Sequence, residues 1–290
     1  MAQSVQSVQR VIQHGPVAVP TFIYGTAWKE ENTQVLVETA LAAGFRGIDT
    51  ANQRRHYVEA AVGDALNAVI EQGSLTREDL FVQTKFTDVA AQDHRLPYDP
   101  RADYADQVVQ SLQSSLDHLR TSYVDAYILH GPSTLRGLTA ADWEIWRAME
   151  QLQNQGVVRS IGISNITSEQ LTALLEEASI KPSFVQNRCF ARTRWDAATR
   201  ALCRDNDICY QGFSLLTANA AELNRAQVHA IARRLGCTLA QVVFRFCLQA
   251  GMIVLTGTTR KQHMREDLGA YDIEELTPQE MDVIENVARL

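Results

Sequence analysis

The sequence predicts an α/β fold: a (β/α)8 TIM barrel preceded by a short N-terminal β-hairpin. Short apolar runs alternate with helical patterns along the chain, which is the order of a parallel sheet covered by helices. Most runs lack a polar–apolar alternation, as expected for strands that are buried on both faces. Eight such units are present, and a barrel of eight units needs about 250 residues, fewer than the 290 of this chain.

The apolar runs are the expected strands of the barrel. They occupy residues 22–27, 45–49, 81–85, 124–130, 157–164, 184–187, 208–213 and 252–256. Residues 10–20, which precede the first run, form the expected hairpin.

Helices are expected between these runs. Residues 32–44 form the first, which ends in a glycine, and the second opens at His56 and Tyr57. Apolar residues at helical spacing define the buried faces: Val58, Val62, Leu66 and Ile70 in the second helix, and Val109, Leu112, Leu116 and Leu119 in the third. Four segments have the spacing of a capping box: Thr76–Asp79, Thr167–Gln170, Thr238–Gln241 and Thr277–Glu280, the last with Pro278 at the first helical position.

Nothing along the chain marks a domain boundary. The sequence has no linker, low-complexity tract or shift in composition, so we expect a single domain over residues 1–290. A doubly wound open sheet is the alternative architecture. It should carry a glycine-rich turn after the first strand, and no GxGxxG motif occurs.

Composition narrows the classes of function. The net charge of −7 and the pI of about 5.5 argue against a broad nucleic-acid surface. No apolar run approaches the roughly 20 residues that span a bilayer, and the N-terminus lacks the pattern of a signal peptide. Five scattered cysteines without a CxxC pair indicate free thiols rather than disulfides or a metal site. We therefore expect a cytoplasmic protein, a monomer, with no nucleic-acid or membrane partner and no metal.

Three ionisable residues end three successive expected strands: Asp49, Lys85 and His130. In such a barrel the carboxyl ends of the strands meet at one mouth, where active sites lie. A single Asp there is often a helix cap, and a single His is often a core residue. Three ionisable side chains at one mouth predict an active site. Each of them must be paired or desolvated there, and such costly arrangements cluster at functional sites.

The loop after the last expected strand suits an anion. It holds Gly257, Thr258, Thr259, Arg260 and Lys261, which combine a permissive glycine, two hydroxyls and two cations. Loops at this position of a barrel often bind phosphate. A phosphate-bearing cofactor lying across the mouth is therefore predicted, and a solvated turn before a helix is the alternative.

Several motifs together resemble the aldo-keto reductases, in order and in spacing, from about residue 25 to residue 268. They are GFRGIDTA, QTKFT, YILHGP, SIGISN, FVQN and the closing LAQVVFRFCLQAGMIVLTGTTRKQHMRED. The resemblance implies a (β/α)8 barrel that reduces aldehydes or ketones with NAD(P)H. NADPH is the expected cofactor, and NADH is possible, because the lysine usual in the phosphate loop is absent here.

The resemblance also implies a catalytic tetrad of Asp, Tyr, Lys and His. Asp49, Lys85 and His130 match three of its members. The tyrosine usually lies five residues after the aspartate, where this chain has Arg54, and counting back from Val62-Gly63 gives His56. We expect Tyr57 to be the proton donor, with His56 as the alternative.

Further positions match cofactor contacts of the family. The resemblance assigns Ser164, Asn165 and Gln186 to the nicotinamide carboxamide, and Phe213 to the ring. It assigns pyrophosphate contacts to Ser214 and Leu216, the 2′-phosphate to Gly257 and Thr258 with charge from Arg260 and Lys261, and adenine to Glu266 and Asp267. Gly25 and Thr26, at the end of the first strand, complete the predicted cofactor site.

The resemblance implies proton transfer supported by a lysine. Lys85 is expected to lower the pKa of the tyrosine, which is near 10 in the free residue. Asp49 is expected to keep Lys85 charged and placed, and His130 to orient the carbonyl oxygen.

The substrate pocket is expected to include Trp28, His56 and His94. His94 lies in the long segment 86–100, where Arg95 and Tyr98 are further candidates. No long C-terminal loop follows the last helix, so we expect an open site that admits bulky carbonyls.

Two other functions fit parts of the pattern. A cofactor-binding regulatory subunit of the same fold would keep the cofactor site and turn over poorly. A metal-dependent barrel hydrolase would use Asp49, His56 and His130, but Lys85 would repel its cation and no paired-histidine motif is present.

Overall fold

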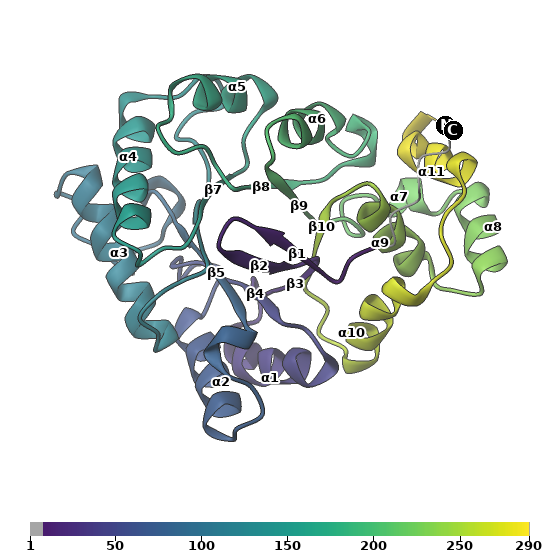
Figure 1. Ribbon diagram of the computed structural model, residues 1–290, viewed down its shortest axis with the longest axis horizontal. Helices are drawn as coiled ribbons and strands as arrows, with labels where there is room; N and C mark the ends of the chain where they lie inside the picture. The colour runs from purple at the N-terminus through teal and green to yellow at the C-terminus, as the bar shows by residue number, and fades with distance from the viewer. Residues whose placement is uncertain (1–7, 290) are drawn as a thin grey trace.

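The predicted barrel is confirmed. The computed structural model describes residues 8–289 and contains a closed barrel of parallel strands in the order β10-β3-β4-β5-β6-β7-β8-β9 (Figure 1). The strands are β3 (Phe22–Gly25), β4 (Gly47–Asp49), β5 (Phe81–Phe86), β6 (Ala126–Leu129), β7 (Ile161–Ser164), β8 (Phe184–Arg188), β9 (Cys209–Phe213) and β10 (Ile253–Thr256). That the chain is a single domain stays a prediction.

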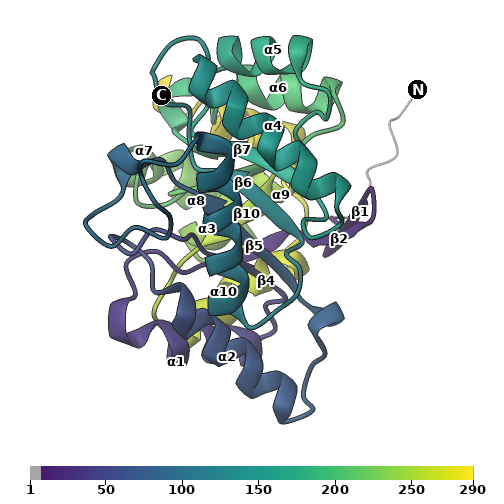
Figure 2. The same cartoon turned by 90° about the vertical axis from the view of Figure 1, so that its left-hand side faces the viewer.

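The predicted hairpin closes one end of the barrel. It consists of β1 (Val11–His14) and β2 (Val17–Pro20), which pair antiparallel. Val17 and Val19 belong to the apolar cluster inside the barrel, together with Phe81 and Phe184 at the start of their strands. Figure 1 looks onto the hairpin at the centre of the ring, and Figure 2 shows it at one end of the molecule. The carboxyl ends of the strands form the opposite end, which is the mouth.

The helices surround the barrel (Figure 1). They are α1 (Thr33–Ala43), α2 (Glu59–Glu71), α3 (Tyr104–Leu119), α4 (Ala140–Asn154), α5 (Ser168–Glu177), α6 (Ala197–Asp205), α7 (Ala220–Leu223), α8 (Ala226–Leu235), α9 (Leu239–Gln249), α10 (Lys261–Leu268) and α11 (Pro278–Glu285). All four predicted capping boxes are present, and Thr139 with Asp142 forms a fifth at the start of α4.

Two details of the predicted helices are wrong. Helix α2 begins at Glu59 rather than at His56, because the amides of His56 and Tyr57 donate to the carbonyl of Gln53 at 3.1 and 3.0 Å and form a turn. In α3, Val109 is 48% exposed and the neighbouring Val108 is buried instead. The first error concerns where the helix begins and the second concerns its buried face, and both helices lie where the pattern predicts them.

A buried carboxylate joins α2 to β5 and α3. Glu59, at the start of α2, accepts hydrogen bonds from the hydroxyl of Thr84 and from Nδ1 of His118. The helices are in close contact here: a Cβ placed on Gly63 would lie 1.9 Å from the carbonyl oxygen of His118. Glycine at this position is therefore required by the approach of the two backbones.

The Glu59–His118 pair makes stability depend on pH. The hydrogen bond to Glu59 raises the pKa of His118 above its ordinary value. The stabilisation is therefore fully present below about pH 6.5, the unfolded value, and is lost as pH rises through the higher folded value. We expect His118→Gln to lower the free energy of unfolding, measured by urea denaturation, more at pH 6 than at pH 9. His229→Gln is the matched control, and an equal loss at both pH values would contradict the prediction.

Candidate active site

An ion pair is buried at the mouth between the ends of β4 and β5. Nζ of Lys85 lies 2.6 and 2.7 Å from the two carboxylate oxygens of Asp49, and 2.8 Å from the carbonyl oxygen of Thr50. The two residues are 0% and 3% exposed. Burial lowers the pKa of Lys85, and Asp49 opposes this shift. All three N–H groups of the ammonium are thus donated to fixed acceptors.

Tyr57 lies beside this ion pair. The ammonium of Lys85 is 5.2 Å from the centroid of the Tyr57 ring, which is 6.1 Å from the ring of His130. Burial, and secondly the charge of Asp49, raise the pKa of Tyr57. The expected lowering of this pKa by Lys85 is not found, because burial, and secondly the charge of Asp49, outweigh the effect of the ammonium. Tyr57 therefore holds its proton, as an acid must before it acts.

His130, which follows β6, is a neutral imidazole at the mouth. Burial, with the nearby charges of Lys85 and His56, lowers its pKa to about 3. Its Nδ1 lies 2.7 Å from the hydroxyl of Thr87, and the backbone amide of His130 donates to the carbonyl of Phe86. A neutral imidazole has one N–H, which can donate to an oxygen atom of a substrate.

Two of the three predicted substrate residues lie together. The rings of Trp28 and His56 are 3.9 Å apart, and the amide of Trp28 donates to the carbonyl of His56 at 2.7 Å. Trp28 is 68% exposed, so it offers an apolar surface beside His56. His94 is exposed on its loop, and among residues 8–289 no hydrogen bond or ring contact joins it to this group. Tyr98 is in the core, since its buried hydroxyl donates to the carbonyl of Thr87 at 2.7 Å.

The residues predicted to hold a carboxamide meet at the ends of β7 and β8. The hydroxyl of Ser164 donates to the carbonyl of Gln186 at 2.7 Å. Nδ2 of Asn165 donates to the carbonyl of His130 at 2.8 Å and to the hydroxyl of Ser164 at 3.1 Å. These bonds fix the polar groups next to His130.

Thr26 and Gly25, two predicted cofactor contacts, lie at the end of β3 beside Asp49. The amide and the hydroxyl of Thr26 both donate to the carbonyl of Asp49, at 3.0 and 2.9 Å, and Thr26 is fully buried. Gly25, in register with Asp49, is the last residue of β3. The side chain of Thr26 therefore holds the end of β4 in place.

The loop after β10, which was predicted to bind phosphate, has a cation beside it that the sequence did not predict. Nζ of Lys29 donates to the carbonyl of Gly257, and a Cβ on Gly257 would lie 3.4 Å from that ammonium. Burial lowers the pKa of Lys29. Thr258 is held by its carbonyl, which accepts from the hydroxyl of Tyr24 at 2.9 Å. Lys29 lies in a different loop, after β3, and no spacing in the sequence links it to residue 257.

The other predicted cofactor residues lie around the same part of the mouth. Arg260 and Lys261 are exposed, and neither has a carboxylate within 4.0 Å among residues 8–289. Phe213 is half-buried at the end of β9, with the guanidinium of Arg188 5.6 Å from its ring. Ser214 and Leu216, which follow it, are also half-buried.

Asp267 faces the barrel. Its Oδ2 accepts from the hydroxyl of Thr256 at 2.8 Å, whereas the neighbouring Glu266 is partly exposed. Burial raises the pKa of Asp267 to about 6. Asp267, which was predicted to contact adenine, therefore has one carboxylate oxygen hydrogen-bonded to the end of β10.

Replacing Asp267 by Asn is expected to stabilise the protein at neutral pH. Its folded pKa is higher than the ordinary value of 3.8, so stability falls as pH rises from about 4 through 6. We expect Asp267→Asn to raise the free energy of unfolding by about 1–3 kcal/mol at pH 8, and the gain to vanish below pH 4. Urea denaturation at both pH values measures it, with the exposed Asp205→Asn as control. A loss of stability at pH 8 would contradict the prediction.

Three residues in or next to the site were not predicted: Gln83 and Gln211 inside the barrel, and Thr87 at the mouth. Gln83 lies two positions before Lys85 in β5, so the period of two along the strand places both on the inner face. That alternation was the available signal. Thr87 follows the end of β5 and contacts the ring of His130. Gln211 of β9 contacts Gln83 across the barrel, at a separation of 128 residues, which no local pattern reveals.

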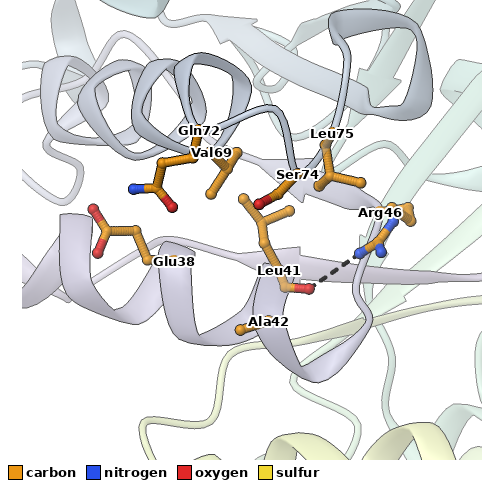
Figure 3. Close-up of a pocket in the computed structure, with 8 residues that line it drawn as sticks. All are labelled: Glu38, Leu41, Ala42, Arg46, Val69, Gln72, Ser74 and Leu75. Carbon is orange, nitrogen blue, oxygen red and sulfur yellow. Dashed lines mark hydrogen bonds between the residues drawn. The ribbon is translucent and has the colours of Figure 1, made fainter.

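A pocket of about 400 Å³ lies elsewhere, between α1 and α2 (Figure 3). Its lining residues are Glu38, Leu41, Ala42, Arg46, Val69, Gln72, Ser74 and Leu75. Arg46 and Leu75 precede β4 and β5, so the pocket is at the end of the barrel opposite Asp49. It contains none of the predicted site residues.

Residues 8–289 contain neither a metal-binding cluster nor a membrane-spanning helix. No three His, Cys, Asp or Glu side chains are grouped so that they could bind a metal ion. No helix in this part of the chain has the length and apolarity needed to cross a bilayer.

Known proteins resemble this chain over nearly its whole length. A sequence profile of the aldo/keto reductase family matches residues 21–289. An aldo-keto reductase from Mycobacterium avium (strain 104) is 30% identical over 285 residues, which cover 98% of this chain and 91% of the relative. An uncharacterized oxidoreductase, YtbE, from Bacillus subtilis (strain 168) is 29% identical over 274 residues, 94% of this chain and 90% of the relative.

Solved structures share the fold. The crystal structure of an aldo/keto reductase from Brucella melitensis superposes with a TM-score of 0.79 at 25% identity, and covers 96% of this chain and 98% of its own.

Proposed function

The chain belongs to the aldo/keto reductase family, and on that premise we propose that it reduces an aldehyde or ketone to an alcohol with NADPH. Family and fold support oxidoreductase activity on carbonyl compounds. The observation that carries the proposal is the buried Asp49–Lys85 pair, with the ring of Tyr57 5.2 Å from the ammonium.

The residues at the mouth fit such a cofactor. Lys29, Arg260 and Lys261 place positive charge around the loop after β10, which suits a phosphate. Phe213 offers a half-exposed ring to a planar group, and Gln186 offers an amide. When bound, NADPH supplies the hydride. The added cations favour NADPH over NADH through the extra phosphate.

Residues of this chain supply the proton that the carbonyl oxygen receives. Tyr57 holds it and passes it to the oxygen of the carbonyl as negative charge develops there. Lys85 stabilises the phenolate that remains, and Asp49 and the carbonyl of Thr50 keep the ammonium in place. Neutral His130, held by Thr87, donates its N–H to the same oxygen and orients it.

We also propose that the enzyme acts as a monomer in the cytoplasm. The cysteines (Cys189, Cys203, Cys209, Cys237 and Cys247) are free thiols, which suit a reducing compartment.

Oxidation of NADPH followed at 340 nm, with a panel of aldehydes and ketones, tests the proposal. We expect turnover with NADPH, slower turnover with NADH, and tolerance of bulky aromatic aldehydes beside the exposed Trp28. No turnover with either cofactor on any carbonyl would overturn the assignment.

A regulatory, cofactor-binding protein is the second candidate. It is favoured by one observation: within residues 8–289, no hydrogen bond joins the hydroxyl of Tyr57 to Lys85. Tight binding of NADPH, measured by quenching of tryptophan fluorescence, together with a complete absence of turnover would support it. The metal-dependent hydrolase is disfavoured, because both oxygens of Asp49 accept from Lys85.

A further inference from the structure

Three glutamine side chains fill the barrel beneath Lys85, and the proton transfer described above does not use them. They are Gln83 of β5, Gln186 of β8 and Gln211 of β9. Gln83 and Gln211 are 0% exposed and Gln186 is 4% exposed. Of the three, Gln186 is therefore the one that reaches the mouth.

The Asp49 carboxylate determines how two of these amides are turned. Paired with Lys85, it can only accept hydrogen bonds. Its Oδ1 accepts from Nε2 of Gln83 at 2.5 Å and from Nε2 of Gln186 at 2.9 Å. Both glutamines must therefore present their nitrogen, and not their oxygen, to Asp49.

The third amide completes the network. Oε1 of Gln211 accepts from Nε2 of Gln83 and from Nε2 of Gln186, each at 3.0 Å. Nε2 of Gln211 donates back to Oε1 of Gln83 at 2.8 Å. Since Gln211 faces two nitrogens, it can only present its oxygen to them, and its nitrogen is left for Gln83.

Both N–H groups of the Gln186 side chain are used inside the barrel. An amide nitrogen has two N–H groups, and those of Gln186 are donated to Asp49 and to Gln211. The oxygen of the side chain is the group that remains. If Gln211 were apolar, the nitrogen of Gln186 would lose one of its two acceptors, and rotation of the amide would cost less.

We propose that the Gln83–Gln211 pair is a positioning unit that holds the nitrogen of Gln186 inside the barrel and so offers its oxygen to a ligand at the mouth. The inference rests on the proposed function. It specifies the ligand group as an N–H donor, which the carboxamide of a nicotinamide ring provides. The two glutamines act through Gln186 and touch no ligand themselves.

The affinity for a cofactor analogue tests whether the oxygen of Gln186 faces the ligand, without any measurement of turnover. The 3-acetylpyridine analogue of NADP⁺ carries a methyl ketone in place of the carboxamide and has no N–H to donate. We expect wild-type protein to bind NADP⁺ about tenfold more tightly than the analogue, measured by quenching of tryptophan fluorescence. In Gln211→Met the ratio should fall by about twofold or more, because Asp49 alone then holds the nitrogen of Gln186 and the amide can turn that nitrogen to the ketone oxygen at a lower cost.

Two further variants separate positioning from a general loss of structure. Gln83→Met should reduce the ratio in the same way and serves if Gln211→Met fails to fold. Gln107→Met is the matched control: Gln107 is 4% exposed and its Nε2 donates to the carbonyl of Ala102, outside the network. Its ratio should equal that of the wild type.

The outcomes distinguish this inference from the proposed function. Wild-type protein that binds neither dinucleotide overturns both. Wild-type protein that binds NADP⁺ and the analogue equally, or network variants that keep the wild-type ratio, overturn the positioning role alone.

Discussion

Tyr57→Phe is expected to lower kcat for aldehyde reduction by about 10²–10⁴-fold, the range typical of a lost general acid. The phenol is the protonated group beside Lys85 and His130, and phenylalanine keeps the ring while removing the proton. Initial rates at 340 nm under saturating NADPH measure the change. Binding of NADPH, followed by fluorescence, should stay within about twofold of the wild type, because the ring that fills the site is retained.

Two variants control this experiment. Tyr127→Phe removes another buried hydroxyl, which donates to the carbonyl of Val108 on α3, and should leave kcat unchanged. His56→Ala should retain most of its turnover, because His56 stacks on Trp28 at the rim. The reverse result, with turnover lost in His56→Ala and kept in Tyr57→Phe, would make His56 the proton donor.

Lys85→Met is expected to cost about 3–5 kcal/mol of folding free energy, which is typical when one partner of a buried ion pair is removed. Asp49 would keep its bonds from Gln83 and Gln186 but would lie 3% exposed without a counter-charge. Urea denaturation at pH 7 measures the loss. The double variant Asp49→Asn/Lys85→Met should recover a large part of it, since it leaves no unpaired charge.

Lys181→Met is the control for this substitution, because Lys181 is exposed. A loss for Lys85→Met no larger than for Lys181→Met would show that the carboxylate finds solvent or another partner. The ion pair could not then be what holds the ammonium beside Tyr57.

The fold was predictable because its signals are local. Each strand is a short apolar run, and the capping threonines mark helix starts through contacts only three residues long, such as Thr277 with Glu280. Asp49, Lys85 and His130 could be placed at one mouth because a parallel barrel brings the carboxyl ends of its strands together.

The remaining features of the site depend on contacts that are distant in sequence. Gln83 lies in a buried strand, and its role appears only when Gln211 is brought opposite to it. Lys29 reaches Gly257 from another loop. The pKa of Tyr57 could not be inferred from the nearby lysine alone, because burial and Asp49 outweigh it.

The hairpin at the closed end of the barrel has a practical consequence for immobilising the enzyme. Both strands of the hairpin lie at the end of the barrel opposite the mouth (Figure 2). A linker fused ahead of β1 would therefore attach the protein to a solid support through its sealed base. The catalytic opening would then face the bulk solution, and reactants could diffuse to it unobstructed by the support.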